Sequence, residues 1–222
     1  MALSDKRILE EMKKRNIVIS PFSKKHLSTS SYDVTLGEFY YREQPPKPHH
    51  PFFNIWEEKN VKEVWGEYVR AEKLSNFSKA PKKLSGIGQR DRVIFLRPNE
   101  TILAHTNEFI GGRNTVTTMM KARSSLGRCF IAVCKCAGWG DVGYINRWTM
   151  EITNSSRYYT IPLVVGRRVA QIVFFETGSI LNKEKDYSVS GKYQSYSDIG
   201  EIKKNWKPEM MLPRLWKEVK KV

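Results

Sequence analysis

Cysteine, acidic residues and long apolar runs are all scarce in this chain of 222 residues. The three cysteines, Cys129, Cys134 and Cys136, are odd in number and close together, which excludes a disulfide framework and indicates reduced thiols. No run of about 18 apolar residues is present, so we expect no membrane span. The first residues also lack the apolar core of a secretory signal. We therefore expect a cytoplasmic protein without a membrane partner.

The shortage of acids leaves a strong positive charge. Lysine and arginine number 38 against 23 acidic residues, which gives a net charge of +15. Such an excess is typical of proteins that bind nucleic acid, a membrane surface or a small polyanion. Apart from Lys217, Lys220 and Lys221 near the C-terminus, the charge is spread along the chain. This diffuse pattern argues against nucleic acid as a partner, since a small polyphosphate ligand needs only a few converging cations.

The pattern of apolar residues predicts a mainly β protein. With 40% hydrophobic and 12% aromatic residues, the chain can bury a substantial core. Its length fits one domain over residues 1–222, with a variable insert at about 43–87 and a C-terminal lid or tail from about 179. Short alternating segments separated by turns predict antiparallel strands. We expect them at 17–19, 30–37 (ending at Gly37), 92–97, 101–106, 115–122, 148–153, 158–164 and 169–176.

Helices are predicted only near the two ends. Helical spacing at 4–15 predicts a short N-terminal helix with Ser4 as its N-cap, and similar spacing within 208–222 predicts a docked C-terminal helix. The insert is rich in proline, and its histidine pair, His49 and His50, is expected in a solvated loop. We expect four aromatic residues to anchor the insert: Trp56, Trp65, Tyr68 and Phe77.

Residues 123–128, Arg-Ser-Ser-Leu-Gly-Arg, suit an anionic ligand rich in oxygen. Arginine forks onto phosphate, serine hydroxyls are short donors, and Gly127 allows the backbone to approach a ligand closely. Farther along, a glycine-rich hairpin around Asp141 precedes the strand that carries a single carboxylate, Glu151. Apolar neighbours on that strand predict a partly dry environment, which raises a carboxyl pKa. Together these segments predict a compact site.

Three segments in order, at 123–128, 137–144 and 148–154, resemble the RSSLxR, AGxxDxG(Y/F/W) and WTLE(I/L)xN motifs of the dCTP deaminase and dUTPase superfamily, in its deaminase branch. The resemblance begins at residues 3–5 and continues to Gly-Lys-Tyr-Gln at 191–194. It implies a distorted, dUTPase-like antiparallel β-barrel assembled as a homotrimer, with each active site shared between subunits.

The resemblance also assigns roles to residues. Glu151 matches the general acid/base, while Ser124, Arg128 and the backbone of Ala137 match contacts to water and base. Asp141 would accept a hydrogen bond from the 3′-hydroxyl, and Tyr144 would pack on the deoxyribose. The nucleotide-binding set is Arg123, Ser125, Trp139, Asp141, Tyr144, Gln171, Tyr187, Lys192 and Gln194. The alternative for Glu151 is a surface salt bridge to Arg147.

The implied reaction is hydrolytic deamination of dCTP to dUTP and ammonia without zinc, because the zinc-deaminase signature H-x-E…P-C-x-x-C is absent. Magnesium would accompany the triphosphate, held mainly by phosphate oxygens. The cysteines are instead expected in strands. Trp139 resembles a residue of bifunctional members, so dUMP formation stays open, as does a non-catalytic, trimeric nucleotide-binding protein. Whether dTTP inhibits is also left open.

Several positions depart from the family pattern. Gly140 and Val142 stand where isoleucine and proline are usual, Asn146 stands near a usual glycine, and Tyr196 replaces a glutamine in the tail. Asparagine tolerates positive φ, so the hairpin remains feasible. We expect the extra glycine to loosen it, which would make dUMP formation the weaker reaction.

Overall fold

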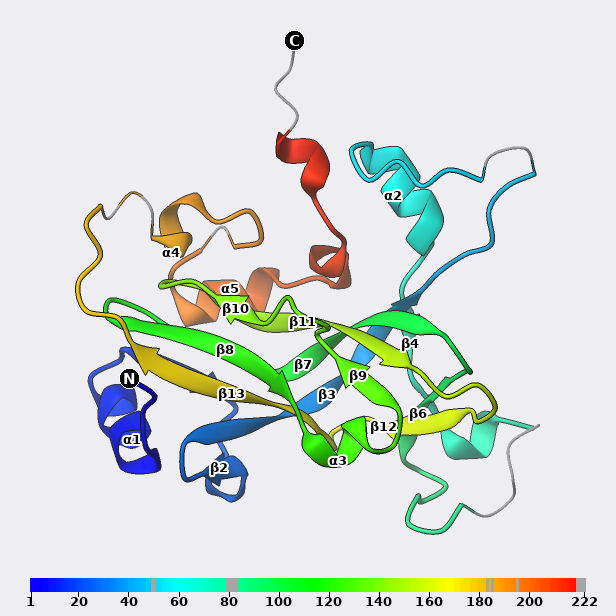
Figure 1. Cartoon of the computed structure of the whole chain (residues 1–222), viewed down its shortest axis with the longest axis horizontal. Helices are drawn as coiled ribbons and strands as arrows, with labels where there is room; N and C mark the ends of the chain where they lie inside the picture. Colours follow the sequence, from blue (N-terminus) through cyan, green and yellow to red (C-terminus); the bar gives the residue numbers. More distant parts are fainter. Residues whose placement is uncertain (49–50, 79–83, 183, 185, 195, 219–222) are drawn as a thin grey trace.

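The computed structural model describes residues 1–48, 51–78, 84–182, 184, 186–194 and 196–218 (Figure 1). His49, His50, Lys220 and Lys221 lie outside the described residues. The predicted N-terminal helix is confirmed as α1 (Asp5–Lys13), whose N-cap Ser4 accepts a hydrogen bond from the Arg7 amide at 3.4 Å.

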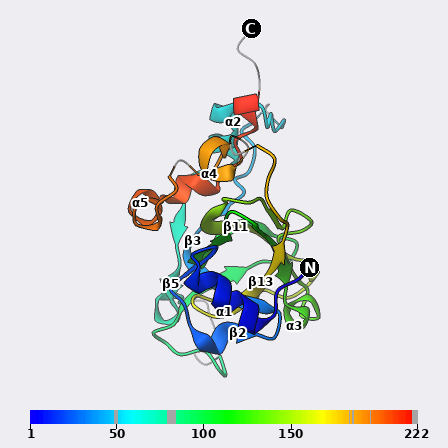
Figure 2. The same ribbon diagram turned by 90° about the vertical axis from the view of Figure 1, so that its left-hand side faces the viewer.

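The larger sheet has ten antiparallel strands and curls into a half-barrel (Figures 1 and 2). Its main path runs β10-β8-β13-β3-β7-β11-β9, and β1, β2 and β4 pair beside that path. The strands are β1 (Ile17–Ser20), β2 (Leu27–Ser28), β3 (Ser31–Arg42), β4 (Val69–Arg70), β7 (Thr101–Gly112), β8 (Val116–Ala122), β9 (Ile131–Val133), β10 (Trp139–Gly140), β11 (Ile145–Asn154) and β13 (Arg168–Glu176). A second sheet, in the order β12-β6-β5, comprises Ile161–Val164, Arg92–Leu96 and Glu72–Lys73. The prediction of a distorted antiparallel barrel is thereby confirmed.

The core lies inside the curl of the larger sheet. Alternate residues of β11 and β13 are buried, as the sequence alternation predicts, whereas the first seven residues of β3 are all buried. Tyr32, Leu36, Met150, Ile172 and Phe174 are among the fully buried side chains. Each such side chain contributes roughly 1.5–3 kcal/mol through burial, so the core holds the site's strands in place.

The prediction that a strand ends at Gly37 is wrong, because β3 continues to Arg42. A Cβ atom on Gly37 would lie 2.0 Å from Cε1 of His105 on the neighbouring strand β7. Here the glycine makes room for a buried imidazole instead of ending the strand. His105 accepts a hydrogen bond at Nε2 from the Phe39 amide at 3.2 Å, and this bond links β7 to β3.

The insert contains a helix that the sequence analysis did not predict, α2 (Glu58–Trp65), followed by the 3₁₀ turn η2 (Leu74–Asn76). Three of the four predicted anchors pack as expected. Trp65 joins a cluster with Val61, Tyr68 lies edge-on to Phe39, and Phe77 lies edge-on to Phe95. The expectation for Trp56 is wrong, since half of its surface is exposed.

The predicted helical C-terminal tail is confirmed. The segment expected to form one helix within 208–222 contains, over residues 208–218, two 3₁₀ helices, η4 (Pro208–Met211) and η5 (Leu215–Glu218). Two helices in the tail were missed: α4 (Tyr187–Ser190) and α5 (Ile199–Asn205). Figures 1 and 2 show α2, α4, α5 and the tail as far as Glu218 on one side of the larger sheet.

The cysteines do not occupy strands, so that expectation is wrong. Cys129 follows the short helix α3 (Ser124–Gly127), and Cys134 follows β9 with φ 62°. All three are free thiols, and only Cys134 is buried. Separately, no helix among the described residues is long and apolar enough to cross a membrane.

Candidate active site

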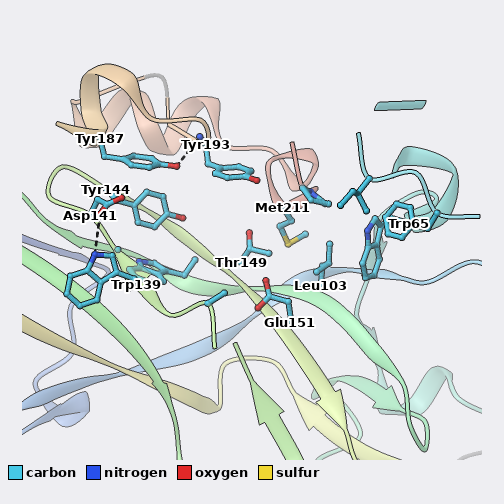
Figure 3. Close-up of a pocket in the computed structure, with 16 residues that line it drawn as sticks. Trp65, Leu103, Trp139, Asp141, Tyr144, Thr149, Glu151, Tyr187, Tyr193 and Met211 are labelled. Atoms are coloured by element: carbon cyan, nitrogen blue, oxygen red, sulfur yellow. Dashed lines mark hydrogen bonds between the residues drawn. The ribbon is translucent and has the colours of Figure 1, made fainter. Parts of the chain in front are cut away.

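A pocket of about 480 Å³ lies between β11 and the tail (Figure 3). Its volume falls in the range of roughly 300–1,000 Å³ that is typical of small-molecule sites. Strand β11 supplies Trp148, Thr149 and Glu151, and the segment before it supplies the residues from Ala137 to Tyr144 that line one end. The remaining walls are Phe53, Ile55, Trp65, Leu103, Tyr187, Tyr193, Met211 and Pro213.

Glu151 is partly buried on β11, opposite Leu103 of β7. Burial raises the pKa of its carboxyl above the ordinary value, and the charge of Lys135 opposes that shift. The predicted dry environment is therefore confirmed. The alternative of a salt bridge is not supported within the described residues, since Arg147 instead stacks over Phe109 and Trp206 at 5.0 and 4.6 Å.

The glycine-rich segment 138–144 is not a hairpin, because β10 pairs with β8 whereas β11 pairs with β7 and β9. The segment crosses from one edge of the curled sheet to the strands on its other side. A turn precedes it, in which the Ala137 amide donates to the Cys134 carbonyl at 2.8 Å. The backbone amide of Ala137 is therefore already bonded within its own chain.

Gly140 does not loosen this crossing, and the expectation that it would is wrong. A Cβ atom there would lie 2.4 Å from the Trp148 ring and 2.5 Å from Thr118 Oγ1. The Gly140 carbonyl also accepts hydrogen bonds from the hydroxyls of Thr117 and Thr118, at 2.7 and 3.2 Å. Glycine is needed because the indole occupies the space that a side chain would take.

Asn146 also behaves differently from the expectation. It lies within β11 without positive φ, and the positive φ of this region belongs to Gly143, at 95°. The Asn146 amide donates to the Tyr193 carbonyl at 3.1 Å. The asparagine therefore ties the tail to the strand.

Aromatic rings and one acid form the end of the pocket away from the insert. Tyr144 lies edge-on between Trp148 and Tyr187, with ring centroids 5.2 and 5.0 Å away. Burial raises the pKa of the Tyr144 phenol. The exposed Trp139 donates from Nε1 to an Asp141 carboxylate oxygen at 3.2 Å. This interaction orients the acid at the pocket rim.

Two predicted residues of the tail make contacts outside the pocket lining. The buried Gln194 accepts from the Ile145 amide at 2.7 Å and donates to the carbonyls of Gly143 and Tyr196, each at 3.0 Å. It therefore holds the tail against β11. Lys192 forms an ion pair with Glu218, and neither residue lines the pocket.

The predicted phosphate-binding segment does not reach the pocket of its own chain. Ser124, Ser125 and Arg128 are exposed on or directly after α3, and none of them lines the pocket. Figures 1 and 2 place α3 on the side of the larger sheet away from α4 and α5. The candidate residues thus fall into two separate groups in one copy of the chain.

Arg123 and Gln171 belong to the second group. Arg123 lies 3.7 Å from Asp33 of β3, and Arg168 pairs with the same buried carboxylate at 3.0 Å. Gln171 is the register partner of Asp33 on β3 and of Lys121 on β8. A cationic and polar surface therefore surrounds Asp33.

Several lining residues were missed. Tyr193 belongs to the Gly-Lys-Tyr-Gln segment that matches the family tail, so that match was the available signal. Trp65 was predicted only as an anchor, and Leu103 and Met211 show no sequence signal beyond apolarity. No group of three His, Cys, Asp or Glu side chains within the described part of the chain could hold a metal.

The antiparallel half-barrel carries a pocket with two acids and an aromatic wall, which suits a small-molecule substrate. The family description "dCTP deaminase-like" matches residues 2–177. The chain belongs to this family.

Proteins of similar sequence and one solved structure are consistent with this family assignment. "dCTP deaminase, dUMP-forming" of Methanocaldococcus jannaschii is 28% identical over 176 residues, covering 78% of this chain and 81% of the relative. The protein of the same name in Methanococcus aeolicus is 30% identical over 185 residues, covering 80% and 84%. The 2′-deoxycytidine 5′-triphosphate deaminase structure from Agrobacterium tumefaciens matches with a TM-score of 0.53 at 17% identity. That match covers 82% of this chain but only 50% of the longer Agrobacterium chain, and it shows the fold.

Proposed function

We propose that this chain deaminates dCTP hydrolytically and releases ammonia. The observation that carries the proposal is a partly buried carboxylate, Glu151, with a raised pKa at the centre of a pocket that also holds Asp141 and an aromatic wall. The names of the relatives support the same reaction. The test is to incubate the protein with dCTP and magnesium, separate the nucleotides by chromatography and measure ammonia.

Glu151 would move protons during the reaction. A water oxygen bonds to C4 of cytosine while Glu151 takes a proton from that water and passes it to N3. The hydroxyl now on C4 then gives its proton, through Glu151, to the amino group. The C4–N bond breaks, ammonia leaves, and C4 becomes a carbonyl carbon. A carboxyl with a raised pKa is suited to both steps, because acid–base catalysis works best near the operating pH.

The remaining pocket residues would bind the sugar and base. Asp141 would accept from the 3′-hydroxyl, and the rings of Tyr144 and Tyr187 would pack on the deoxyribose. Magnesium would enter with the triphosphate and shield its charge, which needs few protein ligands. Free thiols are consistent with the reducing cytoplasm, where the deoxynucleotides are made.

We further propose a homotrimer in which two copies share each site. The support is that Ser124, Ser125 and Arg128 lie away from the pocket of their own chain, so a neighbouring copy would have to supply them. Symmetric assembly brings the same two surfaces together at every interface. Light scattering at micromolar concentration should give three chains per particle, and an active monomer would contradict this.

Mixing two inactive variants tests the sharing directly. Arg128→Ala and Glu151→Gln should each abolish activity. In randomly mixed trimers about one quarter of shared sites would contain both native residues, so activity should return to about that fraction. If both residues acted within one chain, mixing would restore nothing.

Formation of dUMP is the second candidate, and the names of the relatives favour it. Gly140 is held by close packing and hydrogen bonds and does not loosen the crossing segment. We therefore no longer expect dUMP formation to be weak. Forming dUMP requires a second water that attacks the α-phosphate. Asp33 could hold that water, and its carboxylate is already paired with Arg123 and Arg168. A time course separates the candidates, since dUTP appearing before dUMP indicates two steps and dUMP with pyrophosphate from the start indicates one. A purely nucleotide-binding protein would retain dCTP unchanged.

A further inference from the structure

Arg147 of β11 is a partly buried cation without a carboxylate partner. It takes part in none of the ion pairs among the described residues, and its buried Nε atom has no hydrogen-bond partner there. The two acids that act on it are already engaged, because Glu38 pairs with Arg70 and Glu108 accepts two hydrogen bonds from Thr35. Burial lowers the pKa of the guanidinium, yet the group stays charged. A desolvated charge is unfavourable unless another interaction compensates for it.

Two aromatic rings supply this compensation. The guanidinium carbon of Arg147 lies 5.0 Å from the ring centre of Phe109 on β7 and 4.6 Å from that of Trp206, which directly follows α5. A cation over an aromatic face is attracted by the ring quadrupole, and tryptophan is the best of the rings. The contact therefore joins the strand that carries Glu151 to the tail. Trp206 lies beyond residues 2–177, so the family match does not account for this contact.

Trp206 also connects two apolar clusters. One cluster fixes α5 against the sheet, through Ile202 of the helix and Phe109 of β7. The other contains Leu103 and Met211, which both line the pocket. The Trp206 ring packs against both clusters. The position of this ring is therefore transmitted to two residues of the pocket wall.

We propose that Arg147 is a positioning residue, which holds Trp206 in place and thereby keeps the tail over Glu151 as a wall of the pocket. The proposal rests on the proposed function, since it takes the pocket as the dCTP site. In Figure 3, Tyr193 and Met211 of the tail lie across the pocket from Glu151. Trp206 stands between these two residues in the chain, so the contact lies between the two parts of the tail that line the pocket. Arg147 does not line the pocket itself and acts on the nucleotide only through the tail.

Trypsin measures the docking of the tail directly. Two exposed lysines of α5, Lys203 and Lys204, lie just before Trp206, and cleavage there requires the helix to leave the sheet. Arg147→Met keeps a long unbranched side chain but removes the charge, and it should speed cleavage after these lysines about 10-fold. Arg147→Lys keeps a cation and should restore most of the protection.

Kinetics and binding then separate positioning from a general loss of structure. Arg147→Met should raise the KM and the dissociation constant of dCTP several-fold, while kcat stays within about 3-fold because Glu151 remains on its strand. Arg147→Lys should recover most of the affinity. Arg97→Met is the matched control, because the Arg97 side chain is 73% exposed and does not line the pocket. The control should change neither cleavage nor KM.

A double-mutant cycle shows whether Arg147 acts through Trp206. Trp206→Leu removes the ring, so adding Arg147→Met to it should change cleavage and KM no further. Urea denaturation of each variant confirms that the barrel remains folded. An equal effect of Arg147→Met with and without the Trp206 ring would overturn the inference.

The remaining outcomes separate this inference from the proposed function. If the wild-type protein converts dCTP and Arg147→Met leaves KM unchanged, the inference alone is wrong, whether or not the tail is cleaved faster. Faster cleavage with weaker dCTP binding that Arg147→Lys restores, without any ammonia from dCTP, would support the inference and sink the proposed deamination. Failure of the wild-type protein to bind dCTP would sink both.

Discussion

The side-chain oxygen of Gln194 accepts a hydrogen bond from the Ile145 amide at 2.7 Å, where β11 begins. The same buried side chain donates to the carbonyls of Gly143 and Tyr196. One residue thus joins the tail, the crossing segment and the strand that carries Glu151. The tail forms part of the pocket wall because of this anchor, and its motion as a lid stays a prediction.

Replacing Gln194 should therefore loosen the pocket. Gln194→Ala leaves a buried amide unpaired, which costs about 1–3 kcal/mol. We expect a lower denaturation midpoint and a KM for dCTP raised several-fold. Gln44→Ala, an exposed glutamine of the insert, is the control and should change neither. An unchanged KM in Gln194→Ala would show that the tail does not shape the site.

Gly140→Ala tests the packing beneath the crossing segment. The added methyl group would overlap the Trp148 ring and Thr118, and such overpacking costs typically about 1–3 kcal/mol. Chemical denaturation should detect that loss together with reduced activity. Gly88→Ala is the control, because its Cβ would meet Asp91 only at an ordinary 3.6 Å. Equal stability of the two variants would contradict the described contact.

His105 should make stability depend on pH. Burial lowers the pKa of its imidazole from 6.5 to about 4. Between pH 4 and 6.5 the unfolded chain then binds more protons than the folded chain. The stability contributed by neutral His105 is therefore complete above pH 6.5 and is lost as the pH falls toward 4. The full decrease in the free energy of unfolding is about 3 kcal/mol.

His105→Phe removes this titration and keeps a ring. The free energy of unfolding, measured by urea denaturation at several pH values, should fall less steeply between pH 6.5 and 4 in the variant. The slope is compared and not the absolute stability, because Phe also loses the hydrogen bond to the Phe39 amide. Identical slopes would mean that His105 titrates normally in the folded chain.

The sequence predicted the strands well because inward and outward residues alternate along them. β11 is the clearest case, since the placement of Glu151 followed from Trp148, Met150 and Ile152. The pocket lining was harder to predict. Trp65, Leu103 and Met211 meet only through tertiary packing, and apolar residues give no local sign of which neighbours they will meet.

The errors at glycine share one physical cause. Sequence reasoning took Gly37 and Gly140 as positions of backbone freedom, whereas both make room for a ring, that of His105 and of Trp148 respectively. The His105 ring comes from a strand distant in sequence, and Trp148, although near Gly140 in sequence, meets it across a crossing segment and not across a paired hairpin, so local patterns reveal neither contact. The tail helices were missed for a related reason, because α4 and α5 are short and depend on packing against the barrel.

The most direct test of the account is the activity of Glu151→Gln. The amide keeps the shape of the side chain but cannot shuttle a proton, so dCTP deamination should fall by about 10²–10⁴-fold or more. Binding of dCTP, measured by titration calorimetry, should stay within a few-fold of the wild-type value. Glu38→Gln, a carboxylate paired with Arg70 outside the pocket, is the control and should retain full turnover. Near-normal ammonia release by Glu151→Gln would contradict the central claim that this carboxylate carries the proton transfers.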